Sequence, residues 1–353
     1  MRKHRIAVIP GDGIGGEVVD EAVRVAEAAG RRFGFDLAWR RYPWGSSHYL
    51  ASGRMMPADG IAVLAGHDAI LLGAVGDPRV PDHVTLAGLL LPIRREFDQY
   101  ACVRPARSFS GVPSPLAAAR PVDLVVVREN TEGEYAPAGG REHQGTEDEV
   151  ATQTAIFTRR GTERIMRFAF ELARTRSRRL ASITKSNAQA YSMVFWDDVF
   201  DLVRRDYPDV GTESILVDAA CVHLVRRPDT FDVLVASNLF GDILSDLAPA
   251  LTGSLGLAPS ANLNPERIHP SMFEPVHGSA PDIAGQGVAN PVAAILSAGM
   301  MLDFLGEPDA ARTIERAVVT VLGEGLILTP DLGGRAATTE VGAAVVRRVE
   351  TLL

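Results

Sequence analysis

Apolar and polar residues alternate between two periods along the first third of the chain. The apolar run Ile6–Ile9 predicts a strand, and apolar positions every three or four residues across Glu17–Ala29 predict a helix. Gly30 is expected to stop that helix, because glycine is common just beyond a last helical turn. Two further apolar runs, at 35–42 and 68–76, predict strands.

The same alternation continues through the middle of the chain. Residues 86–104 predict a helix that ends at Arg104, because Pro105 disfavours helical backbone in the residue before it. The polar stretch 141–150 predicts a projecting loop or arm. Strands are predicted at 122–130, 179–187, 214–220 and 231–238, and a helix at 162–174. Strands that alternate with helices indicate a parallel sheet covered on both faces.

Polar side chains stand where several predicted strands end: Arg128, Lys185, Asp218 and Asn238. Ligands of open α/β sheets bind outside the carboxyl ends of strands, so these side chains could converge on one crevice. Turns that face water also carry polar residues, but a group with both charge signs favours a site.

Composition describes a globular chain of 353 residues, long enough for two domains or one large one. The net charge of −8 argues against binding to nucleic acid or anionic lipid. The apolar run near the N-terminus is too short for a signal peptide, and none approaches the roughly 20 residues of a membrane helix. Cys102 and Cys221 are the only cysteines, which fits a reduced compartment. We therefore expect a cytoplasmic protein.

Lysine is rare in this chain. Of the 36 basic residues only Lys3 and Lys185 are lysine. A bias toward arginine codons explains most of this pattern. Arginine cannot lose its proton in a protein whereas lysine can, so the interior Lys185 is a candidate proton acceptor.

Three acids are candidate metal ligands. Asp242 and Asp246 lie four residues apart on one face of a predicted helix, and that segment holds no Lys or Arg to neutralise them. Oxygen ligands suit Mg²⁺ or Mn²⁺, and Asp218 offers a third carboxylate. Alternatively, Asp242 and Asp218 cap helices and Asp246 is solvated.

Arginines and one tyrosine could contact an acidic substrate. Arg94, Arg104 and Arg128 suit the carboxylates of a dicarboxylic acid, because guanidinium binds carboxylate in a bidentate way. Arg94 could instead pair with Asp98 one helical turn away. Tyr135 lies in a glycine-bounded loop, where a tyrosine is usually a packing residue. It becomes a candidate catalytic residue only if a neutral lysine lies nearby.

A loop of small residues after the predicted strands offers a phosphate-binding backbone. It contains His277, Gly278 and Ser279, and Asp282 could accept hydrogen bonds from ribose hydroxyls while repelling a 2′-phosphate. The alternative is a structural turn in which Asn290 caps the next helix.

Five segments together resemble the β-decarboxylating dehydrogenases, a family that includes isocitrate, isopropylmalate, homoisocitrate and tartrate/D-malate dehydrogenases. They are GDGIGGEVVDEA, RRE…RP, TKSN, NLFGDILSDLAPALTGSLGLAPSANL and FEPVHGSAPDIAGQGVANPVAAILSAGMMLDFLG. The segments GRMMPADGI, RRGTERIMRFAFELA and PSANLNPER most resemble the tartrate branch, whose members also decarboxylate D-malate.

The resemblance changes the interpretation of Gly11, Gly13 and Gly16, which have the spacing of a Rossmann fingerprint. In this family NAD does not sit on such a turn, and arginines end the second predicted strand where a Rossmann ribose site needs an acid. The resemblance assigns NAD binding to other residues: Ala74, Asn187, His277, Gly278, Ser279, Ala280, Asp282 and Asn290.

The resemblance implies an α/β fold of the isopropylmalate-dehydrogenase type, with a parallel or mixed sheet covered by helices, and not a Rossmann fold. Residues 1–104 and 253–353 would form a large domain, and 105–252 a small domain with a dimer-clasping arm near 136–158. In a homodimer with shared active sites, Lys185 and Asp218 would come from the partner subunit.

The implied reaction is oxidation, with decarboxylation, of a (2R)-2-hydroxy dicarboxylic acid by NAD. Mn²⁺ or Mg²⁺ would be held by Asp218, Asp242 and Asp246, and relatives of this branch also use K⁺. Arg94, Arg104 and Arg128 would grip the substrate. Neutral Lys185 would take the hydroxyl proton and Tyr135 would return a proton to C3.

Three other functions compete with this one. A 3-isopropylmalate dehydrogenase would use the apolar helix around Leu90, and Ala87, where tartrate relatives often carry Trp, leaves room for a larger substrate. A non-catalytic regulatory subunit would lack the acids, Tyr135 or Lys185, which are all present. A plain nucleotide-binding module would leave the arginines and acids unexplained.

Overall fold

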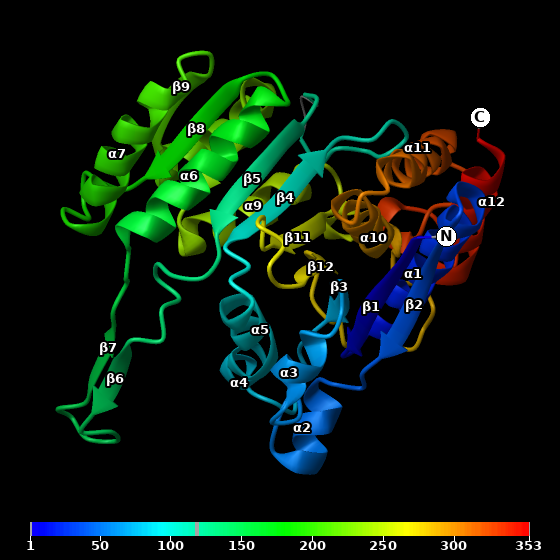
Figure 1. The fold of residues 1–353 in the computed structure, drawn as a ribbon, viewed down its shortest axis with the longest axis horizontal. Coiled ribbons are helices and arrows are strands. Elements are labelled where there is room, and N and C mark those ends of the chain that lie inside the picture. Colours follow the sequence, from blue (N-terminus) through cyan, green and yellow to red (C-terminus); the bar gives the residue numbers. More distant parts are fainter. Residues whose placement is uncertain (1, 117–119, 353) are drawn as a thin grey trace.

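The computed structural model describes residues 2–116 and 120–352. Ten strands form one twisted sheet with helices on both faces (Figure 1). In sheet order they are β2 (Phe35–Arg41), β1 (Arg2–Gly11), β3 (Ala69–Ala74), β12 (Ser271–Pro275), β11 (Pro259–Leu263), β4 (Ala101–Arg107), β5 (Asp123–Glu129), β10 (Val233–Ala236), β8 (Arg179–Thr184) and β9 (Gly211–Leu216).

The sheet is mixed rather than wholly parallel, which corrects the expectation from alternation alone. Strands β2, β1, β3 and β12 run parallel to one another, as do β5, β10, β8 and β9. Between these two blocks, β11 and β4 are joined by antiparallel ladders to each other and to their outer neighbours. The two parallel blocks therefore run in opposite directions within one sheet.

Helices cover the sheet on both sides. They are α1 (Gly15–Phe33), α2 (Ser46–Ser52), α3 (Gly60–Leu64), α4 (Asp82–Thr85), a π-helical turn η1 (Leu86–Leu90), α5 (Leu91–Glu96), α6 (Arg159–Arg174), α7 (Ser192–Val203), α8 (Val217–Arg226), α9 (Asn238–Ala250), α10 (Val292–Phe304), α11 (Pro308–Glu324) and α12 (Thr338–Thr351). None of the described helices combines the length and apolarity needed to cross a bilayer.

Two predicted helix ends are wrong. Helix α1 continues through Gly30 to Phe33 and ends at Gly34, whose φ of 75° is left-handed backbone that glycine adopts without strain. Glycine at position 30 has a packing reason instead, since a Cβ there would lie 3.0 Å from the carbonyl oxygen of Phe35.

The segment 86–104 is not one helix. Helical backbone ends at Glu96, and β4 follows, so Arg104 lies on a central strand. Asp98, with a φ of 43°, turns the chain between helix and strand. Pro105 is tolerated inside β4 because β11 pairs only with Ala101–Val103, and Pro105 lies beyond that ladder.

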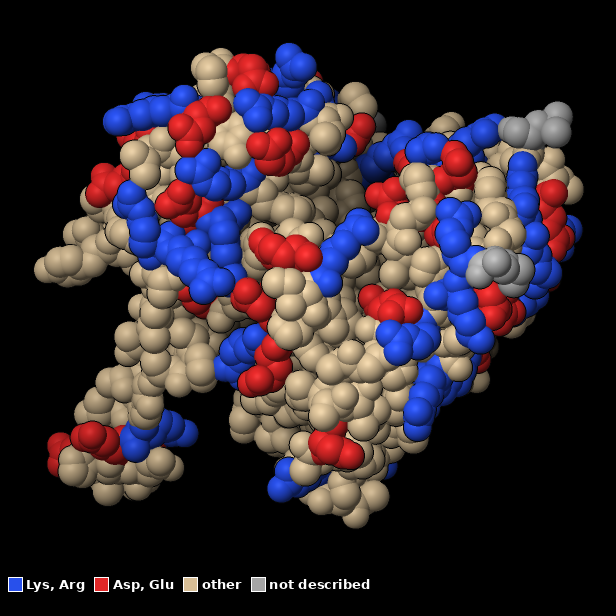
Figure 2. Space-filling model, viewed as in Figure 1, with Lys and Arg blue, Asp and Glu red and all other residues tan. Residues whose placement is uncertain are grey.

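The predicted arm is a hairpin of β6 (Gly139–Glu142) and β7 (Val150–Gln153), and its residues are exposed. It projects away from the sheet (Figure 1) and carries charges of both signs at its tip (Figure 2). Acidic and basic residues are interspersed over the rest of that face, so it presents no broad basic surface. The division into two domains at residues 104 and 253 stays a prediction.

Candidate active site

Four neighbouring strands form the floor of the site on one face of the sheet. Side chains alternate along a strand, so Cys102 and Arg104 of β4 share a face. The ladders align Cys102 with Arg128 of β5 and place Glu274 of β12 opposite Ser260 of β11. The floor therefore joins residues from widely separated parts of the sequence.

Helix α9 brings its acids over this floor. Asp242 accepts hydrogen bonds from Nη1 of Arg128 and, at 2.6 Å, from the hydroxyl of Tyr135. Nη1 of Arg104 lies 3.3 Å from Oδ1 of Asp242 and 3.5 Å from Oδ1 of Asp246. The predicted shared helix face is confirmed. The two acids are paired with arginines from strands β4 and β5. These partners lie outside the helix segment, whose own sequence holds no Lys or Arg.

These contacts set the proton affinities of the site. Burial alone would raise the pKa of Asp242, but Arg128, Arg104 and Tyr135 outweigh it and hold that pKa below its usual value. Burial and the neighbouring Asp242 raise the pKa of Asp246 despite Arg104. Burial and the hydrogen bond to Asp242 raise the pKa of Tyr135 to about 12, so its hydroxyl keeps its proton at neutral pH.

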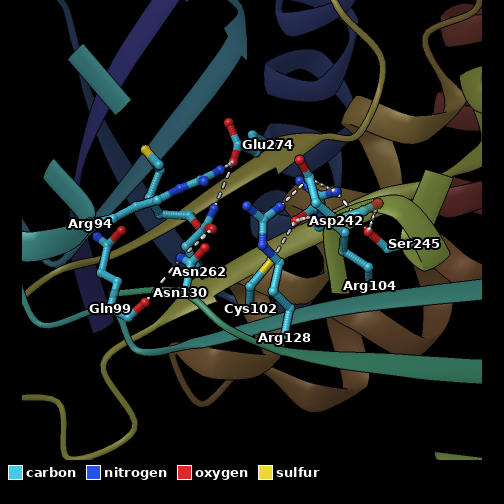
Figure 3. Close-up of polar contacts among 12 residues, drawn as sticks. Arg94, Gln99, Cys102, Arg104, Arg128, Asn130, Asp242, Ser245, Asn262 and Glu274 are labelled. Atoms are coloured by element: carbon cyan, nitrogen blue, oxygen red, sulfur yellow. Dashed lines mark hydrogen bonds and ion pairs between the residues drawn. The ribbon is translucent and has the colours of Figure 1, made fainter. Parts of the chain in front are cut away.

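Arg94 belongs to a second buried group with Asn262 and Glu274, two residues that were not predicted from the sequence. Nη2 of Arg94 donates to Oε1 of Glu274 over 2.8 Å, and Nδ2 of Asn262 donates to the same oxygen over 2.8 Å (Figure 3). The alternative pairing of Arg94 with Asp98 is wrong, since Asp98 pairs with Arg164. An acid inside the apolar segment SMFEP was the available signal for Glu274.

Two further residues fix the arginines. Oδ1 of Asn238, the first residue of α9, accepts from Nε and Nη2 of Arg128 at 2.9 and 2.7 Å. Oγ of Ser245 accepts from Nη1 of Arg104 at 2.8 Å. Both arginines are buried, so these bonds fix their guanidinium groups rather than leaving them solvated.

Lys185 and Asp218 form a separate pair in the single chain. Nζ of Lys185 donates to Oδ1 of Asp218 over 2.6 Å, and the two side chains are 27% and 65% exposed. The hydrogen bond from Lys185 lowers the pKa of Asp218. Asp218 lies in the first turn of α8 and is not its N-cap. Among residues 2–116 and 120–352, no three His, Cys, Asp or Glu side chains are grouped to hold a metal.

The residues predicted to bind cofactor lie on three segments. Ala74 ends β3, and His277, Gly278, Ser279 and Ala280 follow β12. Nε2 of His277 is buried without a hydrogen-bond partner among the described residues, and burial lowers the pKa of its ring. Asp282 and Asn187 are exposed.

Asn290 has a structural role of the kind expected as an alternative. Its Oδ1 accepts from the backbone nitrogen of Val292 at 3.0 Å, at the start of α10, and its Nδ2 donates to Asp331 at 3.0 Å. Leu90, predicted to meet substrate, is 8% exposed in the π-helical turn and packs in a core with Met55 and Ile93.

The fold and this grouping of acids, arginines and tyrosine define a β-decarboxylating dehydrogenase. Residues 5–345 match the model of the isocitrate/isopropylmalate dehydrogenase family, and the chain belongs to that family. Membership implies a divalent metal and NAD or NADP in general terms.

Curated relatives match along nearly their whole length. The chain is 53% identical over 355 residues to a D-malate dehydrogenase (decarboxylating) of Escherichia coli, covering 98% of both chains. It is 53% identical over 349 residues to a probable tartrate dehydrogenase/decarboxylase of Agrobacterium vitis, covering 98% of this chain and 97% of that one. It is 50% identical to a probable tartrate dehydrogenase/decarboxylase of Bacillus subtilis, covering 100% of this chain and 99% of that one.

Solved structures confirm the fold. An isocitrate dehydrogenase from Methylococcus capsulatus superimposes with a TM-score of 0.90 at 39% identity, covering 99% of this chain and 100% of that one. A β-decarboxylating dehydrogenase from Thermococcus kodakarensis superimposes with a TM-score of 0.78 at 37% identity, covering 98% of this chain and 96% of that one. The chain is therefore a decarboxylating dehydrogenase with the fold expected from its sequence.

Proposed function

We propose that the chain oxidises and decarboxylates D-malate or tartrate with NAD and a divalent ion. The observation that carries this proposal is Asp242, on which Arg128, Arg104 and Tyr135 converge. The names of relatives at 50–53% identity support the substrate class, and support 3-isopropylmalate less.

Asp242 and Asp246 fit a divalent ion. Their carboxylates lie one helical turn apart beside the same nitrogen of Arg104, and Asp246 is 60% exposed. Burial and the negative charge of Asp242 raise the pKa of Asp246, and a divalent ion would relieve the repulsion between the two carboxylates. Mg²⁺ and Mn²⁺ prefer oxygen donors of this kind. The partner subunit's Asp218 is proposed to complete the site.

The protein's own side chains divide the remaining work. The buried guanidinium groups of Arg94, Arg104 and Arg128 bind the carboxylate remote from the metal. The partner subunit's Lys185 accepts the proton of the C2 hydroxyl, and Tyr135, which keeps its proton at neutral pH, protonates C3 after loss of CO₂. NAD, when bound, would supply the hydride acceptor, and a divalent ion held by Asp242 and Asp246 would supply a Lewis acid that stabilises negative charge on the substrate.

The homodimer is part of this proposal. Within one chain Lys185 pairs with Asp218, and neither groups with Asp242 and Asp246. A second copy could supply this pair to the acids of the first. The exposed hairpin 139–153 is proposed to clasp the partner, and the cytoplasm is the proposed location.

A substrate panel tests the proposal. D-malate, L-tartrate, meso-tartrate and 3-isopropylmalate are compared by kcat/KM with NAD⁺ and Mn²⁺. We expect D-malate or a tartrate to give the highest value, with CO₂ released from D-malate. A higher kcat/KM for 3-isopropylmalate than for the others would replace the proposed substrate.

A further inference from the structure

The turn between β1 and α1 has glycines at the fingerprint spacing, but they do not behave as a nucleotide cradle. A Cβ on Gly11 would lie 1.9 Å from the carbonyl oxygen of Ala74, and one on Gly13 would lie 2.0 Å from that of Ser279. Both have left-handed backbone, with φ values of 72° and 55°. A Cβ on Gly16 would meet nothing within 4 Å. The first two glycines thus admit neighbouring backbone, and the third is unconstrained.

Hydrogen bonds from the turn hold the same two segments. The backbone nitrogen of Asp12 donates to the oxygen of Ala74 over 2.8 Å, and that of Ile14 donates to the oxygen of Ser279 over 2.9 Å. Ala74, at the end of β3, and Ser279, in the loop after β12, are both among the residues that the family resemblance assigns to NAD binding. One short turn therefore touches both.

The carboxylate of Asp12 extends this contact. It accepts from the backbone nitrogens of Ser46 at 2.8 Å and Gly76 at 2.9 Å, and from Oγ of Ser46 at 2.7 Å. Asp12 is 8% exposed, so these bonds form largely out of water. Its side chain fixes the residues after β2 and β3, while its backbone fixes the end of β3.

We infer that residues 11–15 act as a bracket that sets the spacing of the two cofactor-binding segments, and that Asp12 is a positioning residue for the nicotinamide cofactor. The inference rests on the proposed assignment of Ala74 and residues 277–280 to the cofactor. In this inference the glycines let one backbone segment of the chain pack closely against another. In a Rossmann turn they would instead admit the pyrophosphate and allow close helix packing.

Gly13→Ala and Gly16→Ala form a matched pair that separates these roles. Purified full-length protein is titrated with NADH by fluorescence, and KM is measured for NAD⁺ and for D-malate. Gly13→Ala should raise the NADH dissociation constant and the KM for NAD⁺ by roughly tenfold, because Ala must displace Ser279 at positive φ. KM for D-malate should change by less than about twofold, and Gly16→Ala should leave all three values unchanged.

Asp12→Asn and Ser46→Ala provide a second pair should Gly13→Ala fail to fold. An asparagine amide must point a donor at one of the two backbone N–H groups, whereas Ser46→Ala removes one bond and leaves both N–H groups satisfied. Weaker NADH binding in Asp12→Asn than in Ser46→Ala is expected. Wild-type NADH affinity in Asp12→Asn would overturn the inference.

Direct NADH binding also separates this inference from the proposed function. If the wild type binds NADH but oxidises none of the panel, the substrate proposal fails. The NADH affinities of Gly13→Ala and Gly16→Ala would still test whether residues 11–15 position the cofactor-binding segments. The inference about residues 11–15 alone would be overturned if Gly13→Ala and Gly16→Ala lost NADH affinity equally. Parallel rises in KM for NAD⁺ and for D-malate would overturn it as well. A wild type that binds no NADH would overturn both.

Discussion

The hydroxyl of Tyr135 donates a 2.6 Å hydrogen bond to Oδ2 of Asp242. The guanidinium of Arg128 lies 5.2 Å from the centre of the same tyrosine ring. The phenol is therefore held between an acid proposed to bind metal and an arginine proposed to bind substrate. In the proposed mechanism, this hydroxyl is the group that protonates C3 after CO₂ is lost.

Tyr135→Phe should lower kcat for D-malate by roughly 10²- to 10⁴-fold, the range for loss of a general acid. NADH binding should not change, because the hydroxyl contacts Asp242 and not the cofactor segments. Tyr100→Phe is the control, since its hydroxyl donates to Glu266. A Tyr135→Phe enzyme with the rate of the control would remove Tyr135 from the mechanism.

Asp246→Asn should weaken activation by Mn²⁺ while leaving the fold intact. Its side chain is 60% exposed and contacts only Arg104 at 3.5 Å among the described hydrogen bonds and ion pairs. The Mn²⁺ concentration for half-maximal rate should rise roughly 10- to 100-fold, and EDTA should abolish wild-type turnover until Mn²⁺ is restored. Asp201→Asn, which removes a pair with exposed Arg204, should leave the Mn²⁺ curve unchanged.

Much of the fold follows from the sequence, and its centre does not. Alternating apolar periods correctly predict the outer strands and the positions of helices α1 and α6. The change from helix to strand after Glu96 was missed, because apolar residues are dense on both sides of it and the turn depends on one left-handed residue, Asp98. The antiparallel directions of β4 and β11 depend on pairing between distant segments, which local periodicity does not encode.

The candidate site is likewise predictable from the sequence only where its geometry is local. The spacing of Asp242 and Asp246 predicts a common helix face because helix geometry is local. The partners of these acids are set by the register of β4 against β5, so the contact of Arg104 and Arg128 with Asp242 required the structure. Glu274 was missed for a related reason: among the described residues its ion-pair partner is Arg94, 180 residues earlier.

Lys185→Met should abolish turnover and spare NADH binding, because methionine keeps the length of the side chain and cannot accept a proton. The rate of NADH formation with D-malate measures turnover, and fluorescence titration with NADH measures cofactor binding. Lys3→Met, at an exposed lysine that lies 3.7 Å from Asp36, is the matched control. A near-normal rate for Lys185→Met would exclude its proposed role as proton acceptor.

Mixing two inactive variants tests the shared active site. In a dimer of one Lys185→Met chain and one Tyr135→Phe chain, one of the two sites would receive both wild-type residues. Random assembly makes half of the dimers mixed, so we expect about a quarter of the wild-type activity after co-refolding. Activity no higher than the sum of the separate variants would place Lys185 and Tyr135 in the same chain's site.

Asp282→Lys should shift cofactor preference from NAD toward NADP. The carboxylate is exposed on the loop that follows the proposed cofactor segment, where it would repel a 2′-phosphate and a lysine would attract one. The ratio of kcat/KM for NAD⁺ to that for NADP⁺ is the measurement, with D-malate at saturation. An unchanged ratio would refute the assignment of Asp282 to the ribose.

Glu129 should make the protein less stable as pH rises toward neutrality. Burial raises the pKa of this carboxyl to about 7, although it accepts hydrogen bonds from Thr131 and from the backbone nitrogen of Glu132. Between the ordinary value of 4.5 and about 7, the folded state holds a proton that the unfolded state has released. The contribution of Glu129 to the free energy of unfolding is therefore full below that interval and is lost across it.

Glu129→Gln removes this titration while keeping a similar shape. Urea unfolding of wild type and variant at several pH values across the interval should show a smaller fall of unfolding free energy in the variant. Glu213→Gln, at an exposed position on β9, should keep the wild-type slope. The same slope in all three proteins would mean that Glu129 is already ionised in the folded state at mildly acidic pH, with Thr131 and Glu132 compensating its burial.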